Sequence, residues 1–331
     1  MIDLRERAES LFAPGKGLLA ADESNGSADK RLIAYGIEAG EEMRRKDRNL
    51  FLAAPGIEKY LSGVILFTET IGQSADDGTP FPTVLADRGI MPGVKVDLGT
   101  EPFPESPDEL ITKGLIGLAE RLPGYAAAGM GFTKWRAVIT IDGDRLPTSQ
   151  CLVENAKRLA AYALLVQKAG MVPILEPEVL LDGKHSRLRA KEVITETLKT
   201  LFVALADQAV DISSVVVKSA MALSGNKSGK KDTPEEVAED TLAALIAAVP
   251  KQVPGIMFLS GGQSPDQATE NLAALCARAK RASAPWPLTF CYSRALQDEA
   301  LTLWKGKDEN VEAARAAFLA RLAKVSAARG A

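Results

Sequence analysis

Eight short apolar segments recur along the chain and alternate with segments of helical periodicity. They comprise residues 17–22, 63–69, 93–97, 131–141, 171–179, 213–221, 255–262 and 288–296. Near-continuous apolar runs are typical of strands that are covered on both faces, as in parallel sheets. Eight such strands alternating with helices predict an α/β fold: a single (β/α)8 barrel domain over residues 1–331, with residues 307–331 as an extra C-terminal helix and tail.

Several of the intervening segments carry helix signals. Ser106 followed by Pro107 is typical of a helix start, which predicts a helix within residues 106–129. Ser264 and Gln267 have the spacing of a capping box. Apolar residues recur at helical spacing in residues 151–170, 185–208, 233–249 and 308–330. No GxGxxG pattern follows the first strand, which disfavours an open dinucleotide-binding sheet.

The charge balance and the cysteines exclude several classes of protein. Forty Lys and Arg residues against 43 Asp and Glu residues give a net charge of −3, and no basic stripe is present, so we expect no nucleic-acid or membrane partner. No apolar run approaches the roughly 18 residues of a membrane helix, and residues 1–10 do not resemble a signal peptide. Three widely spaced cysteines are no disulfide framework, so we expect a cytoplasmic protein.

A single histidine, His185, disfavours mechanisms that depend on histidine clusters. Zinc sites use groups of His and Cys, so we expect neither a metal nor a cofactor. His185 lies in a polar segment and is interpreted as a solvated loop residue. Residues 224–233 are rich in Gly, Ser and Lys but lack the spacing of a phosphate-binding P-loop, which predicts a mobile, solvated loop.

Polar side chains follow the apolar segments at the points where the strands are expected to end. They are Asp22, Glu69, Lys95, Asp97, Lys134, Arg136, Glu176, Glu178, Lys218, Ser260, Ser293 and Arg294. The C-terminal strand ends of a (β/α)8 barrel meet on one face, which carries the active site. Salt bridges that merely close the barrel could explain any one of these residues, but desolvating the whole set is costly and favours a functional site.

Lys218 follows three consecutive valines and is the candidate nucleophile. Neighbouring cations in a partly dry pocket are expected to lower its pKa and make its amine neutral. Such an amine attacks a ketone to form a Schiff base, and the iminium acts as an electron sink for cleavage of an adjacent carbon–carbon bond. Nearby carboxylates can move the protons.

Two segments have features of phosphate sites. Residues 259–267 place two glycines before a capped helix start, and Arg294 follows on the next strand. Residues 23–31 place Ser24, Ser27 and Arg31 in a turn that contains a glycine. Ordinary turn chemistry could explain either segment alone. Together they suggest a substrate with a phosphate at each end.

Seven segments closely resemble the signature segments of class I fructose-bisphosphate aldolases. They are AADESNGSADKRL, GVILFTETIGQ, GVKVDLGT, FTKWRAVI, VPILEPEVL, LSGGQS and YSRALQ, in that order along nearly the whole chain. The resemblance implies a (β/α)8 barrel and a lyase of glycolysis and gluconeogenesis. Its reaction is metal-independent, reversible cleavage of fructose 1,6-bisphosphate to dihydroxyacetone phosphate and glyceraldehyde 3-phosphate.

The resemblance also implies roles for individual residues. Catalytic roles fall to Lys218, Glu176, Asp22, Lys134 and Glu178. Substrate-binding roles fall to Ser24, Ser27, Arg31, Lys95, Arg136, Ser260, Gly261, Gly262 and Arg294. Lys218 forms the Schiff base, Glu176 is the main proton shuttle and Asp22 assists it. Lys134 holds this network together, with Glu178 as its partner and Arg136 nearby.

The chain departs from the family pattern in three places. KSAM stands where the family has KPNM, and CYSR stands for SYGR, so Cys291 and Ser293 replace a serine and a glycine near the C1 phosphate. No tyrosine follows Tyr292, whereas long-chain members often end in a catalytic tyrosine. An aldolase that prefers another ketose phosphate, or a non-catalytic phosphosugar-binding scaffold, therefore remains an alternative. The resemblance also implies a homo-oligomer, since members of the family are often tetramers.

Overall fold

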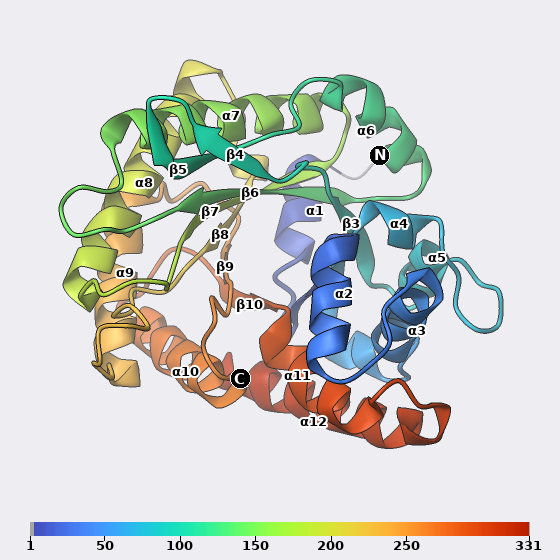
Figure 1. The fold of residues 1–331 in the computed structure, drawn as a ribbon. Coiled ribbons are helices and arrows are strands. Elements are labelled where there is room, and N and C mark those ends of the chain that lie inside the picture. Colours follow the sequence, from blue (N-terminus) through green and yellow to red (C-terminus); the bar gives the residue numbers. More distant parts are fainter. Residues whose placement is uncertain (1–2, 331) are drawn as a thin grey trace.

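Eight parallel strands close into a barrel at the centre of the protein (Figure 1). The structure, a computed structural model, describes residues 3–330. Around the barrel the strand order is β1-β10-β9-β8-β7-β6-β3-β2. The bounds are β1 Gly17–Ala21, β2 Leu61–Leu66, β3 Met91–Lys95, β6 Phe132–Ile139, β7 Val172–Val179, β8 Val216–Ser219, β9 Ile256–Phe258 and β10 Leu288–Tyr292. Each strand overlaps one of the eight apolar segments, so the predicted barrel is confirmed.

Helices pack around the barrel (Figure 1). They are α1 Leu4–Ser10, α2 Asn25–Ala34, α3 Glu41–Leu52, α4 Thr68–Ile71, α5 Phe81–Ala86, α6 Leu118–Ala127, α7 Ser149–Lys168, α8 Arg187–Asp207, α9 Pro234–Ala248, α10 Pro265–Arg281, α11 Arg294–Trp304 and α12 Val311–Ala328. The Ser264 hydroxyl accepts the Gln267 N–H at 3.2 Å and caps α10. Both bonds of a capping box form at Thr233 and Glu236, at the start of α9.

An antiparallel hairpin stands between β3 and β6, where the sequence predicted a helix. Its strands are β4 Thr100–Phe103 and β5 Ser106–Thr112. The helix predicted to start at Ser106 is therefore wrong, and α6 begins only at Leu118.

Contacts with α7 explain why this segment is extended. The Glu109 carboxylate accepts the Thr148 backbone N–H at 2.9 Å and the Thr148 hydroxyl at 2.5 Å. Phe103 and Ile111 bury their side chains with Cys151 of α7. A Ser-Pro pair is compatible with a helix start or with the first residues of an edge strand. Here the contacts with α7 stabilise the strand.

The C-terminal helix α12 lies across α10, α11 and α3 (Figure 1). The Phe318 ring packs edge-on against Phe51, with 4.9 Å between ring centroids. Just beyond the helix, the Arg329 guanidinium donates to the backbone carbonyls of Phe12 and Leu288, each at 2.8 Å. The predicted C-terminal helix is thus present, and it ties the segment before β1 to the start of β10.

The barrel interior is apolar below the strand ends. Leu18, Ile65, Phe132, Val216 and Met257 are completely buried there in one cluster. Space is tight, since a Cβ placed on Gly93 would lie 2.2 Å from the Phe132 ring. This close packing leaves this level of the barrel interior to apolar side chains. Within residues 3–330, none of the helices is long and apolar enough to span a membrane.

Candidate active site

A cavity of about 640 Å³ opens at the C-terminal ends of the barrel strands. Most of the predicted site residues line it: Asp22, Ser24, Ser27, Lys95, Lys134, Arg136, Glu176, Glu178, Lys218, Ser260, Gly261 and Arg294. Arg31 and Gly262, which were also predicted, lie outside its lining. The barrel therefore gathers residues from across the sequence in one place, as a (β/α)8 fold does at its active-site face.

Four buried charged side chains alternate in sign within the cavity. The Lys218 ammonium on β8 lies 2.6 Å from Glu176 Oε1 on β7. The other oxygen, Glu176 Oε2, lies 2.9 Å from the Lys134 ammonium on β6. Lys134 in turn lies 2.6 Å from Asp22 Oδ2, immediately after β1. Each of these side chains is at most 10% exposed, so water screens their mutual attraction poorly.

The alternation of charges sets the protonation state of Glu176 and Lys218. Burial by itself raises the pKa of the Glu176 carboxyl, but the ammonium groups of Lys134 and Lys218 outweigh burial and lower this pKa to about 2. Burial and Lys134 lower the pKa of Lys218, yet anionic neighbours including Glu176 raise it overall. The predicted lowering of the Lys218 pKa is therefore wrong for this state. The resting site holds an ammonium–carboxylate pair.

Glu178 has a different partner from the one predicted. It pairs with Arg136 and not with Lys134, whose carboxylate partners are Asp22 and Glu176. Lys134 and Arg136 are two residues apart on β6, as Glu176 and Glu178 are on β7, and the two strands run in parallel. The strand register sets Lys134 opposite Ile174 and Arg136 opposite Glu176, so each ion pair runs diagonally, from a cation on β6 to the carboxylate two residues farther along β7.

The connection between β9 and α10 supplies one candidate phosphate site. Gly261 and Gly262 have φ values of +58° and +89°, which favour glycine and turn the chain into the N-terminus of α10. Arg294, the first residue of α11, is exposed at the rim of the cavity. A Cβ placed on Gly262 would lie 3.8 Å from Arg294 Nη2. Backbone N–H groups at a helix start and a nearby guanidinium suit an anion.

The connections after β1 and β3 line another part of the cavity. Ser24 stands at the N-cap position of α2, and its hydroxyl lies 3.1 Å from that of Ser27. The Lys95 ammonium lies 2.6 Å from Asp97 Oδ1. Arg31 faces elsewhere, because its guanidinium is paired with Glu23 at 2.8 Å and with Asp298 at 3.0 Å. Arg31 thus does not line the cavity but binds Glu23, which does.

Comparison with known proteins agrees with this geometry. The family model "Fructose-bisphosphate aldolase class-I" matches residues 3–331. The chain is 46% identical to a "Probable fructose-bisphosphate aldolase class 1" of Xanthomonas campestris pv. campestris, over 91% of this chain and 89% of the relative. It is 45% identical to a fructose-bisphosphate aldolase of Echinococcus multilocularis, over 99% of this chain and 90% of the relative.

The chain belongs to the class I fructose-bisphosphate aldolase family, and it is a lyase. A crystal structure of the Plasmodium falciparum aldolase, in complex with TRAP and a small-molecule inhibitor, superposes with a TM-score of 0.95 at 40% identity. That match covers 98% of this chain and 93% of the other.

Some residues of this aldolase site were not predicted from sequence. Glu23, Arg121, Cys291 and Ser293 also line the cavity. Burial raises the pKa of the Cys291 thiol to about 11, so this thiol stays protonated near neutral pH. Cys291 was visible only as a departure from the family pattern, whereas Ser293 was also among the polar residues expected at the strand ends. Glu23 adjoins Asp22, which was the one signal for it.

Glu23 is the centre of a second charge network at the edge of the cavity. Its Oε1 accepts hydrogen bonds from the Ser293 hydroxyl at 2.6 Å and from Arg31 at 2.8 Å, and its Oε2 accepts one from Arg48 at 3.1 Å. Burial alone raises the pKa of Glu23, but the two guanidinium groups lower it to about 2. The Ser293 bond joins the connections that follow β10 and β1, two neighbouring strands.

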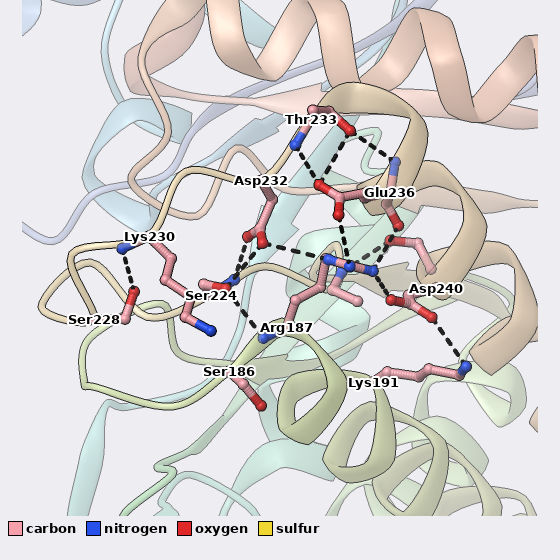
Figure 2. A network of polar contacts seen from close by, with 12 residues as sticks. Ser186, Arg187, Lys191, Ser224, Ser228, Lys230, Asp232, Thr233, Glu236 and Asp240 are labelled. Carbon is pink, nitrogen blue, oxygen red and sulfur yellow. Dashed lines mark hydrogen bonds and ion pairs between the residues drawn. The ribbon is translucent and has the colours of Figure 1, made fainter.

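The connection that follows Lys218 is held by a network of polar contacts (Figure 2). The Asp232 carboxylate accepts the Ser224 N–H at 2.6 Å and the Ser224 hydroxyl at 2.9 Å. Arg187, at the start of α8, lies 3.3 Å from Asp232 and also pairs with Asp240, which binds Lys191 at 2.9 Å. These contacts attach the segment after β8 to both α8 and α9.

His185 is buried, at 8% exposure, so its interpretation as a solvated residue is wrong. The Gly225 N–H donates to the His185 carbonyl at 2.9 Å. A Cβ on Gly225 would lie only 2.3 Å from the Gly183 carbonyl oxygen, so the two loops touch backbone to backbone. The predicted solvated loop is exposed at residues 226 and 227 and at 229–231, but its first two residues, Ser224 and Gly225, are buried.

Proposed function

We propose that this aldolase cleaves fructose 1,6-bisphosphate reversibly to dihydroxyacetone phosphate and glyceraldehyde 3-phosphate, through a Schiff base on Lys218. One observation carries the proposal. The Lys218 ammonium lies 2.6 Å from the Glu176 carboxylate, within the row of four buried side chains whose charges alternate in sign. That contact pairs a nucleophile with the proton carrier that its chemistry requires. The two candidate phosphate sites around the same cavity suit a bisphosphate.

The resting ion pair contains the proton that the first step needs. Transfer of one proton from the Lys218 ammonium to Glu176 yields a neutral amine beside a carboxylic acid. The amine nitrogen bonds to the C2 carbonyl carbon of the substrate, and one proton moves from that nitrogen to the carbonyl oxygen to give a neutral carbinolamine. Protonation of its hydroxyl by Glu176 releases water and leaves the iminium. The Lys134 ammonium, 2.9 Å from Glu176, stabilises the carboxylate that results.

Cleavage of the C3–C4 bond requires a base for the C4 hydroxyl. Glu176 is again an anion at this stage and takes that proton, with Asp22 assisting at C4 and C3. The bonding electrons move toward the iminium and form an enamine on Lys218. Glyceraldehyde 3-phosphate leaves first, and protonation at C3 followed by hydrolysis releases dihydroxyacetone phosphate. Lys134 contacts both carboxylates, and its ammonium lowers the pKa of Glu176.

We assign the phosphate sites by the same logic. Ser260, Gly261, Gly262 and Arg294 hold the C1 phosphate, and Lys95, Ser24 and Ser27 hold the C6 phosphate, with Arg31 behind them. Arg136 and Glu178 flank the sugar chain. We also propose a cytoplasmic location, as the names of the Arabidopsis thaliana ("cytosolic") and Spinacia oleracea ("cytoplasmic isozyme") relatives indicate for those proteins, and a homo-oligomer, to be tested by sedimentation.

Trapping of the intermediate tests the proposal. Purified protein is incubated with dihydroxyacetone phosphate and reduced with borohydride, and the modified lysine is located by mass spectrometry. We expect the adduct on Lys218, and loss of nearly all turnover in Lys218→Ala, because the covalent route is removed. Lys227→Ala, at an exposed lysine, is the control. An adduct confined to another lysine, or cleavage that persists in Lys218→Ala, overturns the assignment.

A further inference from the structure

The cations that line the cavity differ in how far their charge is neutralised. They are Lys95, Arg121, Lys134, Arg136, Lys218 and Arg294. Four of them lie within ion-pair distance of a carboxylate that lines the same cavity. Neither Arg121 nor Arg294 has an ion pair within residues 3–330. The uncompensated positive charge of the cavity therefore comes from these two guanidinium groups.

Arg121 is held in place without being neutralised. It lies on α6, and its guanidinium donates to three backbone carbonyls: Val96 at 3.0 Å, Gly114 at 2.7 Å and Gly117 at 3.3 Å. A guanidinium has five N–H donors, so two remain available after these bonds. The carbonyls restrict the side chain but carry no net charge. Arg121 is thus a fixed cation with spare donors at the wall of the cavity.

The two unpaired guanidinium groups belong to different sides of the barrel mouth. Arg294 follows β10, whereas Arg121 binds the carbonyl of Val96, the residue after β3. In the closed barrel, β10 and β3 are separated by β1 and β2 on the shorter way round. One unpaired cation therefore accompanies each of the two candidate phosphate sites, with Arg121 on the side of Lys95.

We propose that Arg121 is a substrate-binding residue for the C6 phosphate and favours bisphosphates over sugars phosphorylated only at C1. The inference rests on the proposed function. A phosphate monoester carries a charge of about −1.5 to −2 at pH 7. Lys95 can donate hydrogen bonds to it, but Asp97 at 2.6 Å offsets the charge of Lys95. Arg121 supplies the net charge that attracts the phosphate, and its planar donors suit phosphate oxygens.

Steady-state kinetics with fructose 1,6-bisphosphate and fructose 1-phosphate test this role. We expect Arg121→Gln to lower kcat/KM for the bisphosphate about 10- to 100-fold more than for the monophosphate, mainly through KM, as loss of a charge-assisted hydrogen bond does. Arg121→Lys keeps the charge but cannot reproduce the three carbonyl contacts. It should recover much of the preference if charge matters, and none if the role is structural.

Arg158→Gln is the matched control. Arg158 also donates to a carbonyl near this wall, that of Thr112 at 2.9 Å, but it lies outside the cavity lining. Its substitution should leave the ratio of the two kcat/KM values unchanged. The inference is overturned if Arg121→Gln lowers kcat/KM equally for both sugars. It is also overturned if Arg158→Gln changes the ratio of the two kcat/KM values as much as Arg121→Gln does. Wild-type protein that cleaves neither sugar overturns the proposed function instead.

Discussion

Glu23 contributes stability that depends on pH in a defined direction. Burial raises its pKa, but Arg48 and Arg31 lower it from 4.5 to about 2. The folded state therefore binds this proton less readily than the unfolded state. The stabilisation is complete above the unfolded pKa of 4.5 and is lost as the pH falls through the folded value of about 2. At ~1.4 kcal/mol per tenfold change in affinity, the full effect is about 3 kcal/mol.

About 2 kcal/mol of this contribution disappears between pH 7 and pH 3. The side chain is only 17% exposed, so solvent screening reduces the figure little. Glu23→Gln removes the titrating group while keeping its shape. At pH 7 the variant should be less stable than the wild type, because two guanidinium groups lose their carboxylate. At pH 3 the difference should be smaller by about 2 kcal/mol, because only the wild type has lost the contribution.

Urea unfolding at pH 7, 5 and 3, followed by tryptophan fluorescence, measures this difference. Glu42→Gln is the control, because the Glu42 side chain is 66% exposed and its pairing with Arg45 is screened by water. The control should remain as stable as the wild type at each pH. A Glu23→Gln difference that stays constant from pH 7 to pH 3 refutes the reasoning, since it would mean that Glu23 titrates alike in both states.

Ser293→Gly removes the hydroxyl that donates to Glu23 at 2.6 Å, so KM for fructose 1,6-bisphosphate should rise by about 3- to 10-fold with a smaller change in kcat; a loss confined to kcat would contradict this. Arg187→Ala removes the guanidinium beside Asp232 and leaves Lys191 as the cation beside Asp240, so it should lower the free energy of unfolding by about 3 kcal/mol; urea unfolding that matches Lys227→Ala would argue against this. Activity should survive prolonged EDTA treatment, because the iminium serves as the electron sink, and loss that zinc or cobalt restores would exclude this mechanism.

The barrel could be predicted because its signal is local. Each strand overlaps an apolar run that ends in a polar residue, as at residues 215–218, and the (β/α)8 topology then requires the ends to meet. The β4–β5 hairpin could not be predicted in the same way. Ser106 and Pro107 satisfy a local rule for helix starts, while contacts with α7 that are distant in sequence make the segment extended.

The site could be predicted as a set of residues, but not as a set of contacts. Sequence placed Lys134, Glu176 and Glu178 at strand ends, but the pairing of Glu178 with Arg136 runs diagonally across the strand register and could not be inferred from spacing. The Lys218 pKa depends on burial and on several close neighbours, among them Glu176 at 2.6 Å, and no sequence spacing reveals these distances. Arg121 lies on a helix, so only the approach of α6 to β3 brings it to the cavity.

The seam between β1 and β10 has a consequence for the synthesis of the protein. β1 pairs with β2 early in the chain, but its other edge pairs with β10 at Cys291 and Tyr292. A growing chain therefore carries an unpaired, apolar strand edge until β10 has also left the ribosome. Such edges can pair with other chains. The nascent barrel needs its edge shielded during translation, and α12, made after β10, then fastens the two ends of the barrel together.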